Sequence, residues 1–564
     1  MNESAHQRSG GRLLPRTRIC VAILLAIAFA GGRATVTIAA PPAYTWTGFL
    51  NSNWDFTSPN WDTSTSSVVP WVNTNTAVFD GAAAGSITVD YSIIVGGVTV
   101  SSSGYSFTGG SISLDNYSGT PFQIDNDVTI DSDLSGGVLL KTGNGKLILS
   151  GNFNSYTGAT VSAGTLVGTT SSLTGDITNN AVVTFDQSSG GTYSGSMSGS
   201  GSLTKLGSGA VTLSGNNSYS GGTTVSAGTL IGTTSSLQGD ITNEGIVTFD
   251  QSSDGTYSGS MSGSGSLTKL GSGALTLSGN NSYSGGTTVS AGTLIGTTSS
   301  LQGNMTNEGV VTFDQDSDGT YAGLITGSGS LTKLGSGALT LSGNSDYTGT
   351  TTVENGSLFV TGNLSGSSVS VQSGGLLEGD GTIGGSVTVL AGGTLSPGNS
   401  PGILTVSSLQ LDASSTTLLE ITGTIPGSGY DQIDVANALG YGGVLSLTLS
   451  GNYADSTSFA LFTNFTSTSG SFSAITLSAV GTPYAGLSFT PSETTPGSWE
   501  TGPVDPLNPG YSQKLVFSQS TGILAVVPEP SAHALALAAS GFGVYRVWRR
   551  RRAGGKPLPT TTAT

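Results

Sequence analysis

The sequence of 564 residues has little charge and lacks the residues that most enzymes use for catalysis. Only 9% of its residues are charged, against about 25% in an ordinary soluble domain. Ser, Thr, Asn and Gly fill the polar positions instead. Residues 41–527 contain no His, no Cys and no Arg. These absences exclude a Ser–His–Asp or Cys–His nucleophile, a tetrahedral Cys/His zinc site and any disulfide in this segment.

The same segment is also short of cations and of helix formers. It holds six lysines against 31 acidic residues, a net charge of −25. An exterior of this sign repels phosphate backbones, so nucleic acid is not expected as a partner. Cations and neutral, hydroxyl-rich polymers suit it better. No long stretch repeats its apolar residues every 3.6 positions, which excludes a mainly helical protein.

Residues 1–40 have the layout of a secretory signal peptide. A basic stretch, Arg8 to Arg18, precedes the apolar run Ile19 to Ala30, and small residues follow. Cleavage is expected after Ala30 or near Ala40. This segment predicts export through the Sec translocon and cutting by signal peptidase.

The other end carries Pro-Glu-Pro, an apolar run over 532–545 and a basic cluster, in that order. Residues 527–552 resemble the PEP-CTERM sorting signal of bacterial proteins that exosortase handles. The resemblance implies an exosortase-type partner, transient anchoring in the inner membrane, and release to the cell surface or the extracellular space. A permanent anchor is the alternative. The implied processing residues are Pro528, Glu529 and Pro530, and the implied basic stop is Arg549, Arg550, Arg551 and Arg552.

Between the two ends the chain repeats itself with a strict period of 64. The segment Leu203 to Asn216 (LTKLGSGAVTLSGN) recurs at Leu267 and Leu331, and in degenerate form at Leu139. Each unit consists of short alternating apolar and polar runs that end in Gly- and Asn-rich turns, as in β-strands. We expect each unit to form three coils of a β-helix, of about 21 residues each. Equivalent residues of successive units would then lie about 14 Å apart along the axis.

These units resemble the autotransporter-associated β-strand repeat from about 138 to 360. The opening around Tyr44-Thr45-Trp46 and the segment Leu395 to Gly402 resemble the start and the end that such proteins share. The resemblance implies an exported, right-handed parallel β-helix and implies no activity. We therefore expect an all-β chain in which a smaller C-terminal β region, either a small sandwich or a capping extension of the solenoid, follows the β-helix. The expected segments are 1–40 signal peptide, 41–137 start of the β-helix, 138–360 repeats, 361–403 last coils, 404–527 C-terminal β region, 528–552 sorting signal and 553–564 polar tail.

Two groups of side chains are candidates for binding. Asp314, Asp316 and Asp318 alternate like the first half of a calcium loop, but position twelve is Ile325 rather than Glu, and turn carboxylates in solvent are the default interpretation. Trp54 and Trp61 could stack on sugars. They are more typical of a hydrophobic cap on the first coils.

These observations predict an exported, non-enzymatic repeat protein with a structural or adhesive role at the cell surface or in the extracellular matrix. No catalytic residue is assigned. No cofactor is expected, apart from calcium at the candidate residues Asp314, Asp316 and Asp318. The alternative is an extracellular protein that binds or degrades polysaccharide through the N-terminal aromatics or a carboxylate pair, since two acids suffice for a glycosidase.

Overall fold

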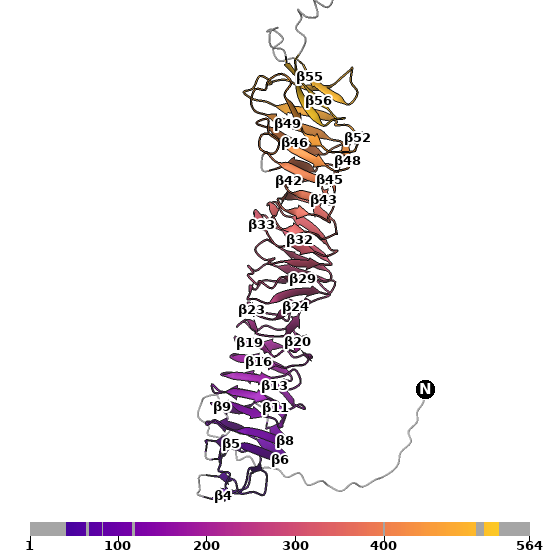
Figure 1. The fold of residues 1–564 in the computed structure, drawn as a ribbon. Helices are drawn as coiled ribbons and strands as arrows, with labels where there is room; N and C mark the ends of the chain where they lie inside the picture. The colour runs from indigo at the N-terminus through magenta and orange to yellow at the C-terminus, as the bar shows by residue number, and fades with distance from the viewer. Residues whose placement is uncertain are drawn as a thin grey trace, which may run out of the picture. The chain divides into compact units, whose positions relative to one another are not determined.

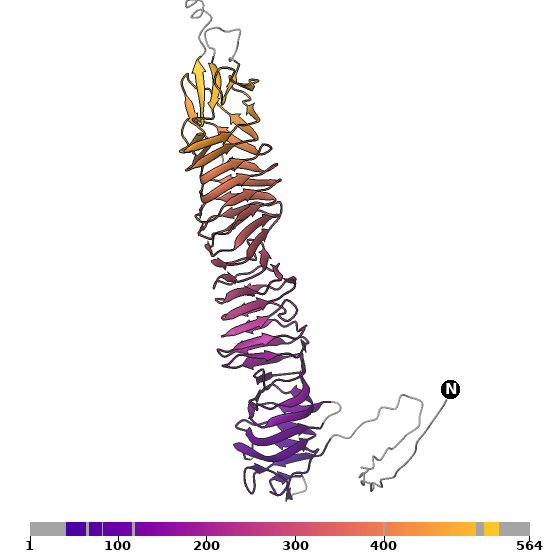
Figure 2. The same ribbon diagram turned by 90° about the vertical axis from the view of Figure 1, so that its right-hand side faces the viewer.

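The fold is all-β in the computed structural model, which describes residues 41–63, 67–81, 83–115, 119–398, 401–502 and 513–528. Strands from successive coils pair in parallel and form a β-solenoid of about 17 turns, which a smaller antiparallel sheet follows (Figures 1 and 2). This confirms the expected fold class. Within the described ranges, no helix is long and apolar enough to cross a membrane.

One coil of the solenoid contains three short strands, and each belongs to a different sheet. β24 (Ile246–Asp250), β25 (Gly255–Tyr257) and β26 (Met261–Ser262) follow one another, and β27 (Ser266–Leu270) then pairs in parallel with β24. Side chains alternate between the inside and the outside of a strand. Leu267 and Lys269 of β27 therefore point into the core, while Ser266 and Thr268 face outward.

One repeated unit is longer than three coils. Leu230 pairs with Val247 on the next coil, Val247 with Leu267, and Leu267 with Thr287, so three coils lead from Leu230 to Thr287. The residue equivalent to Leu230 in the next unit, however, is Leu294, which lies further along the chain. The equivalent strands β19 (Ser202–Leu206), β27 and β35 (Ser330–Leu334) consequently lie in three different sheets. The expectation that each unit forms three coils is therefore wrong. Each unit runs past three coils, so the next unit begins on another face.

The first coil is closed by an aromatic cap. β1 (Ala43–Trp46) pairs in antiparallel fashion with β3 (Trp61–Asp62), which pairs in the same way with β4 (Val68–Val69). β1 also pairs in parallel with β5 (Thr76–Phe79), the start of the regular coils. Four tryptophans fill the space beneath these strands, and each is at most 2% exposed: Trp46, Trp54, Trp61 and Trp71.

The parallel coils continue beyond residue 403, where the sequence analysis placed a separate region. β45 (Ile403–Leu411) pairs with β47 (Gln432–Val435), which pairs with β51 (Phe462–Thr463). Coils here contain more residues. One coil runs from Leu404 to its strand partner Ile433, whereas one coil of the repeats spans only the shorter stretch from Leu267 to its partner Thr287. The longer coils weaken the sequence periodicity, although the solenoid itself is unbroken.

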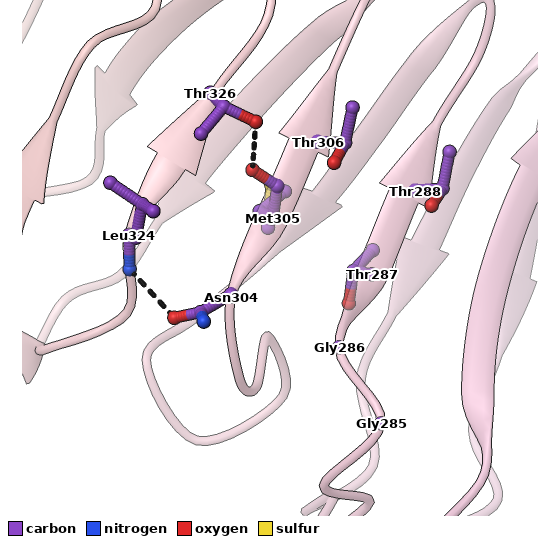
Figure 3. A pocket seen from close by; sticks show the side chains of 9 residues that line it. All are labelled: Gly285, Gly286, Thr287, Thr288, Asn304, Met305, Thr306, Leu324 and Thr326. Carbon is purple, nitrogen blue, oxygen red and sulfur yellow. Dashed lines mark hydrogen bonds between the residues drawn. The ribbon is translucent and has the colours of Figure 1, made fainter.

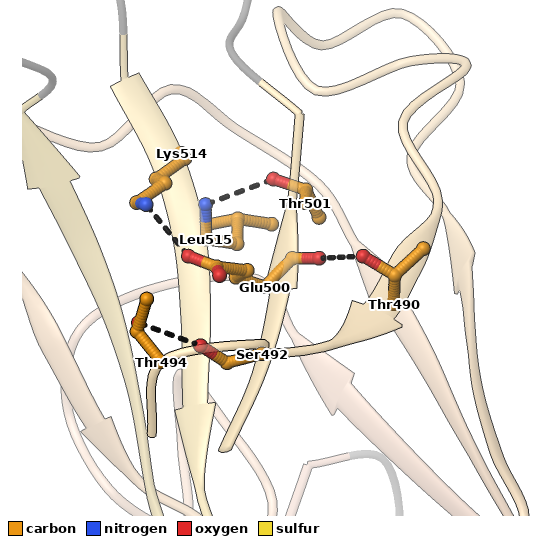
Figure 4. A network of polar contacts seen from close by, with 7 residues as sticks. All are labelled: Thr490, Ser492, Thr494, Glu500, Thr501, Lys514 and Leu515. Atoms are coloured by element: carbon orange, nitrogen blue, oxygen red, sulfur yellow. Dashed lines mark hydrogen bonds and ion pairs between the residues drawn. The ribbon is translucent and has the colours of Figure 1, made fainter. Parts of the chain in front are cut away.

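The last described strands form the antiparallel sheet, which fits the expectation of a capping extension of the solenoid better than that of a sandwich. Its strand order is β50 (Ser458–Ala460), β57 (Ile523–Pro528), β56 (Gln513–Ser518), β55 (Ser498–Thr501), β54 (Phe489–Pro491). A polar network fixes β55 against β56 (Figure 4). In it, Lys514 Nζ lies 2.6 Å from Glu500 Oε2, and the Leu515 amide donates to Thr501 Oγ1 at 3.0 Å.

Candidate functional site

The lysine of each repeated unit is buried, although sequence reasoning gave it no role. Lys205 Nζ donates hydrogen bonds to the carbonyl oxygens of Leu206 (2.5 Å), Gly207 (2.7 Å) and Ala227 (3.2 Å), the last on the next coil. We call this arrangement the lysine clamp. The other copies repeat it around Lys141, Lys269 and Lys333, and all four side chains are 0% exposed.

Burial governs the chemistry of these ammonium groups. Desolvation lowers the pKa of Lys205, and nearby Asp186 partly opposes the shift. The same effect lowers the pKa of Lys141 to about 8. Since all three protons of each ammonium face backbone carbonyls inside the coil, the clamps hold turns together. The alternation of Ser266, Leu267, Thr268 and Lys269 was the sequence signal for a lysine that points inward.

Acidic side chains at the turns bind the backbone of the following coil. Asp176 Oδ1 accepts from the Ser196 amide and Asp240 Oδ1 from the Ser260 amide, both at 2.8 Å. Backbone hydrogen bonds lower the pKa of both aspartates. We call these contacts carboxylate clips. Each clip joins groups that are one coil apart along the chain.

Two of the three calcium candidates are such clips. Asp316 Oδ1 accepts from the amide of Ser336 at 3.0 Å, and Asp318 Oδ1 from that of Ala338 at 2.8 Å. Asp314 is exposed at the end of β32 (Val310–Asp314). In the described part of the chain, no three His, Cys, Asp or Glu residues are grouped so that they could hold a metal ion. Asp316 and Asp318 thus bind backbone amides.

The tryptophans proposed for sugar stacking lie inside the cap. Trp54 and Trp61 are both 0% exposed, and their ring centroids are 5.1 Å apart. Trp71 packs 4.8 Å from Trp61. No ring face is open to a sugar, so the stacking hypothesis is wrong for these two residues. The large apolar area that they bury explains this position.

The expected sorting residues lie at or beyond the last described strand. Pro528 is the exposed last residue of β57. Glu529, Pro530 and the cluster Arg549 to Arg552 fall outside the described residues, as does the expected signal peptide.

A groove lies on the outer face of the third unit. It has a volume of about 250 Å³ and crosses β29 (Thr287–Val289), β31 (Met305–Asn307) and β34 (Ile325–Thr326) (Figure 3). Two glycines leave one wall without side chains, and a Cβ on Gly286 would lie 2.8 Å from a backbone oxygen. The lining contains no charged residue: Gly285, Gly286, Thr287, Thr288, Asn304, Met305, Thr306, Leu324 and Thr326.

The outer surface of the described body is anionic. Of the six lysines in residues 41–527, four are buried in clamps. Lys146 lies 4.0 Å from Asp127 and Lys514 lies 2.6 Å from Glu500. Every cation on the outside of the described body is therefore close to a carboxylate, and an anionic partner finds no unpaired counter-charge there.

Comparison with known proteins identifies the repeats. The family model described as passenger-associated-transport-repeat matches residues 139–167, 203–231, 267–295 and 331–359. Each match begins near the strand that carries a clamp lysine and ends in the coil that completes the clamp. A search of curated proteins gave no match. The chain is thus a β-solenoid in which four segments match the passenger-associated-transport-repeat, which is consistent with an autotransporter-associated repeat protein.

Proposed function

We propose that this protein is an exported, non-enzymatic structural element: a stiff spacer or matrix component at the cell surface. The repeat family supports a secreted or surface location. The C-terminal sequence supports sorting by an exosortase-type enzyme near Pro528, after export directed by the N-terminal signal. An adhesive role is part of this proposal, because the exterior offers repeated neutral hydroxyl and amide groups.

One observation carries the proposal: the polar groups of the repeats are used to join coils. The lysine clamps and carboxylate clips each connect a coil to its neighbour. Buried amides do the same, since Asn243 Nδ2 donates to the Ser266 carbonyl at 2.9 Å and is fully buried. Such contacts in every unit resist local opening, which is the property that a spacer exposed to proteases needs.

Fractionation of the producing cells tests the proposal. Intact-mass analysis should find, at the surface or in the medium, a chain that begins between Ala30 and Pro41 and ends near Pro528. A chain that still carries Arg549 to Arg552 in the membrane fraction would show a tethered protein instead. A chain that stays in the cytoplasm would refute the proposal.

Trypsin provides a second, independent test. It cuts after Lys and Arg, and the four clamp lysines are inaccessible in the folded state. We expect prolonged digestion to spare the bonds after Lys205, Lys269 and Lys333, while cuts are confined to the ends and to Lys146 and Lys514. Rapid cutting at the clamp lysines would contradict a persistent spacer.

A further inference from the structure

The groove on the third unit holds polar groups that the protein itself does not use. Within the described residues, the hydroxyls of Thr288 and Thr306 and the amide nitrogen of Asn304 make no hydrogen bond to protein. Asn304 Oδ1 is occupied, because it accepts from the Leu324 amide at 3.0 Å (Figure 3). Leu324 is itself 37% exposed. The groove thus offers donors, acceptors and an apolar wall side by side.

The equivalent positions in the second unit carry different residues. Its glycine pair is Gly221 and Gly222, but Asp240 stands in place of Asn304 and Ser260 in place of Leu324. Asp240 still clips the next coil, so the fold tolerates either residue at this position. In the first unit Asp and Ser again occupy these two positions, and Thr157 replaces the first glycine. Among these three units, only the third combines the open wall, a neutral amide and an apolar side chain.

The threonines of the groove form a row across the coils. Thr288 pairs in register with Thr306, and Thr306 with Thr326. Neighbouring strands are about 4.8 Å apart, so the three side chains repeat at that spacing across the groove. An extended polymer laid along the row would meet a hydroxyl at each coil.

The geometry points to a binding subsite for a neutral glycan chain in this groove. The C–H face of a sugar ring would pack on Leu324, and its hydroxyls would exchange hydrogen bonds with Thr288, Thr306 and the Asn304 amide. The lining carries no charge, and the described exterior has no unpaired cation to attract a polyanion. The inference rests on the proposed function only in that the chain must be displayed where glycan is present.

The second unit provides matched variants for the test. In the full chain, the double substitution Asn304→Asp with Leu324→Ser places the residues of the second unit at these two positions of the groove. The reverse pair, Asp240→Asn with Ser260→Leu, places the residues of the third unit at the two equivalent positions of the second unit. Both changes exchange residues that the solenoid already accommodates, and circular dichroism and trypsin resistance confirm folding. Equilibrium dialysis with tritium-labelled cellohexaose and maltohexaose then measures affinity and binding capacity.

We expect the natural chain to bind one of these oligosaccharides saturably, with one equivalent per chain. The Asn304→Asp, Leu324→Ser variant should bind about tenfold more weakly, because it loses the apolar contact. The reverse variant should bind two equivalents. No saturable binding of either sugar, an unchanged affinity in the first variant, or equal binding of oligogalacturonate would overturn the inference. Because dialysis uses purified chain, such a failure leaves the cell-surface result intact, and mislocalisation leaves the binding result intact.

Discussion

At the scale of single residues, the clamp lysine differs most from its surroundings. An ammonium group that is buried without a salt bridge is costly unless its protons are bound. Three carbonyl oxygens meet this need around Lys205, two from its own turn and one from the next coil. The positive φ of Gly207 (69°) and Gly228 (68°) places the turns close to the ammonium. The charge thereby becomes a link between coils.

Removal of one clamp should therefore destabilise the solenoid. We expect Lys205→Met to lower the free energy of unfolding by about 2 kcal/mol, because a methionine of similar size leaves the three buried carbonyls without a donor. Urea denaturation measures the change. Lys146→Met is the control: this exposed lysine is 4.0 Å from Asp127 and contributes little. Equal stability of the two variants would show that the clamp does not support the fold.

The lowered pKa of a clamp lysine leads us to expect an unusual dependence of stability on pH. Burial lowers the pKa of Lys141 from 10.5 to about 8, so between these values the unfolded chain binds more protons than the folded one. The free energy of unfolding should then rise from about pH 8 towards about pH 10. At still higher pH the tyrosines oppose the rise, since burial raises the pKa of Tyr156 and Tyr193. Urea midpoints at each pH should show a smaller rise in Lys141→Met, and an identical profile would contradict this account.

At the scale of strands and turns, the alternation of the sequence predicted the elements well. The run Ala274 to Leu277 forms β28 (Ala274–Leu277), with Leu275 and Leu277 inside. The same alternation runs from Ser266 to Lys269 and fits the inward position of Lys269, although that position was not predicted. Its partners could not be predicted, because they depend on how closely two turns approach in space. The carboxylate clips escaped prediction for the same reason, since their acceptors and donors are a whole coil apart.

The groove could not be predicted from the sequence either. Thr288, Thr306 and Leu324 are far apart along the chain, and only the pairing register brings them together. The register depends on coil lengths that differ even within one unit, since Leu230 pairs with Val247 and Val247 with the more distant Leu267. The repeat period indicates a solenoid, but it does not specify how many residues each coil takes.

At the scale of the whole solenoid, both ends differ from the middle. Antiparallel strands cover the first coil at β1, β3 and β4, and the five-stranded sheet follows the last coil. An open coil end presents unpaired backbone groups and invites pairing with another chain. Terminal units that end a repeat array in this way keep it soluble. The repeats between the caps make contacts only with their neighbours, so their number is free to vary.

This leads to a prediction for shortened chains. Deletion of residues 203–266 removes one complete unit and joins Ser202 to Leu267, which is also preceded by a serine in the natural chain. Val183 then takes the place of Val247 beside Leu267, so the core column is restored. We expect unchanged circular dichroism per residue and a trypsin-resistant core that is lighter by one unit.

Deletion of residues 203–234 is the matched control. It removes half a unit and joins Ser202 to Ser235, so a polar turn replaces the strand that buries Leu203 and Lys205. Trypsin should then degrade the chain, because the core columns no longer continue from coil to coil. In the complete-unit deletion, all later strands move together to the next face, and their contacts with one another stay the same. Suppose that trypsin degraded the chain lacking residues 203–266 as quickly as the chain lacking residues 203–234. The units would then not be interchangeable, and the face on which each unit lies would matter for stability.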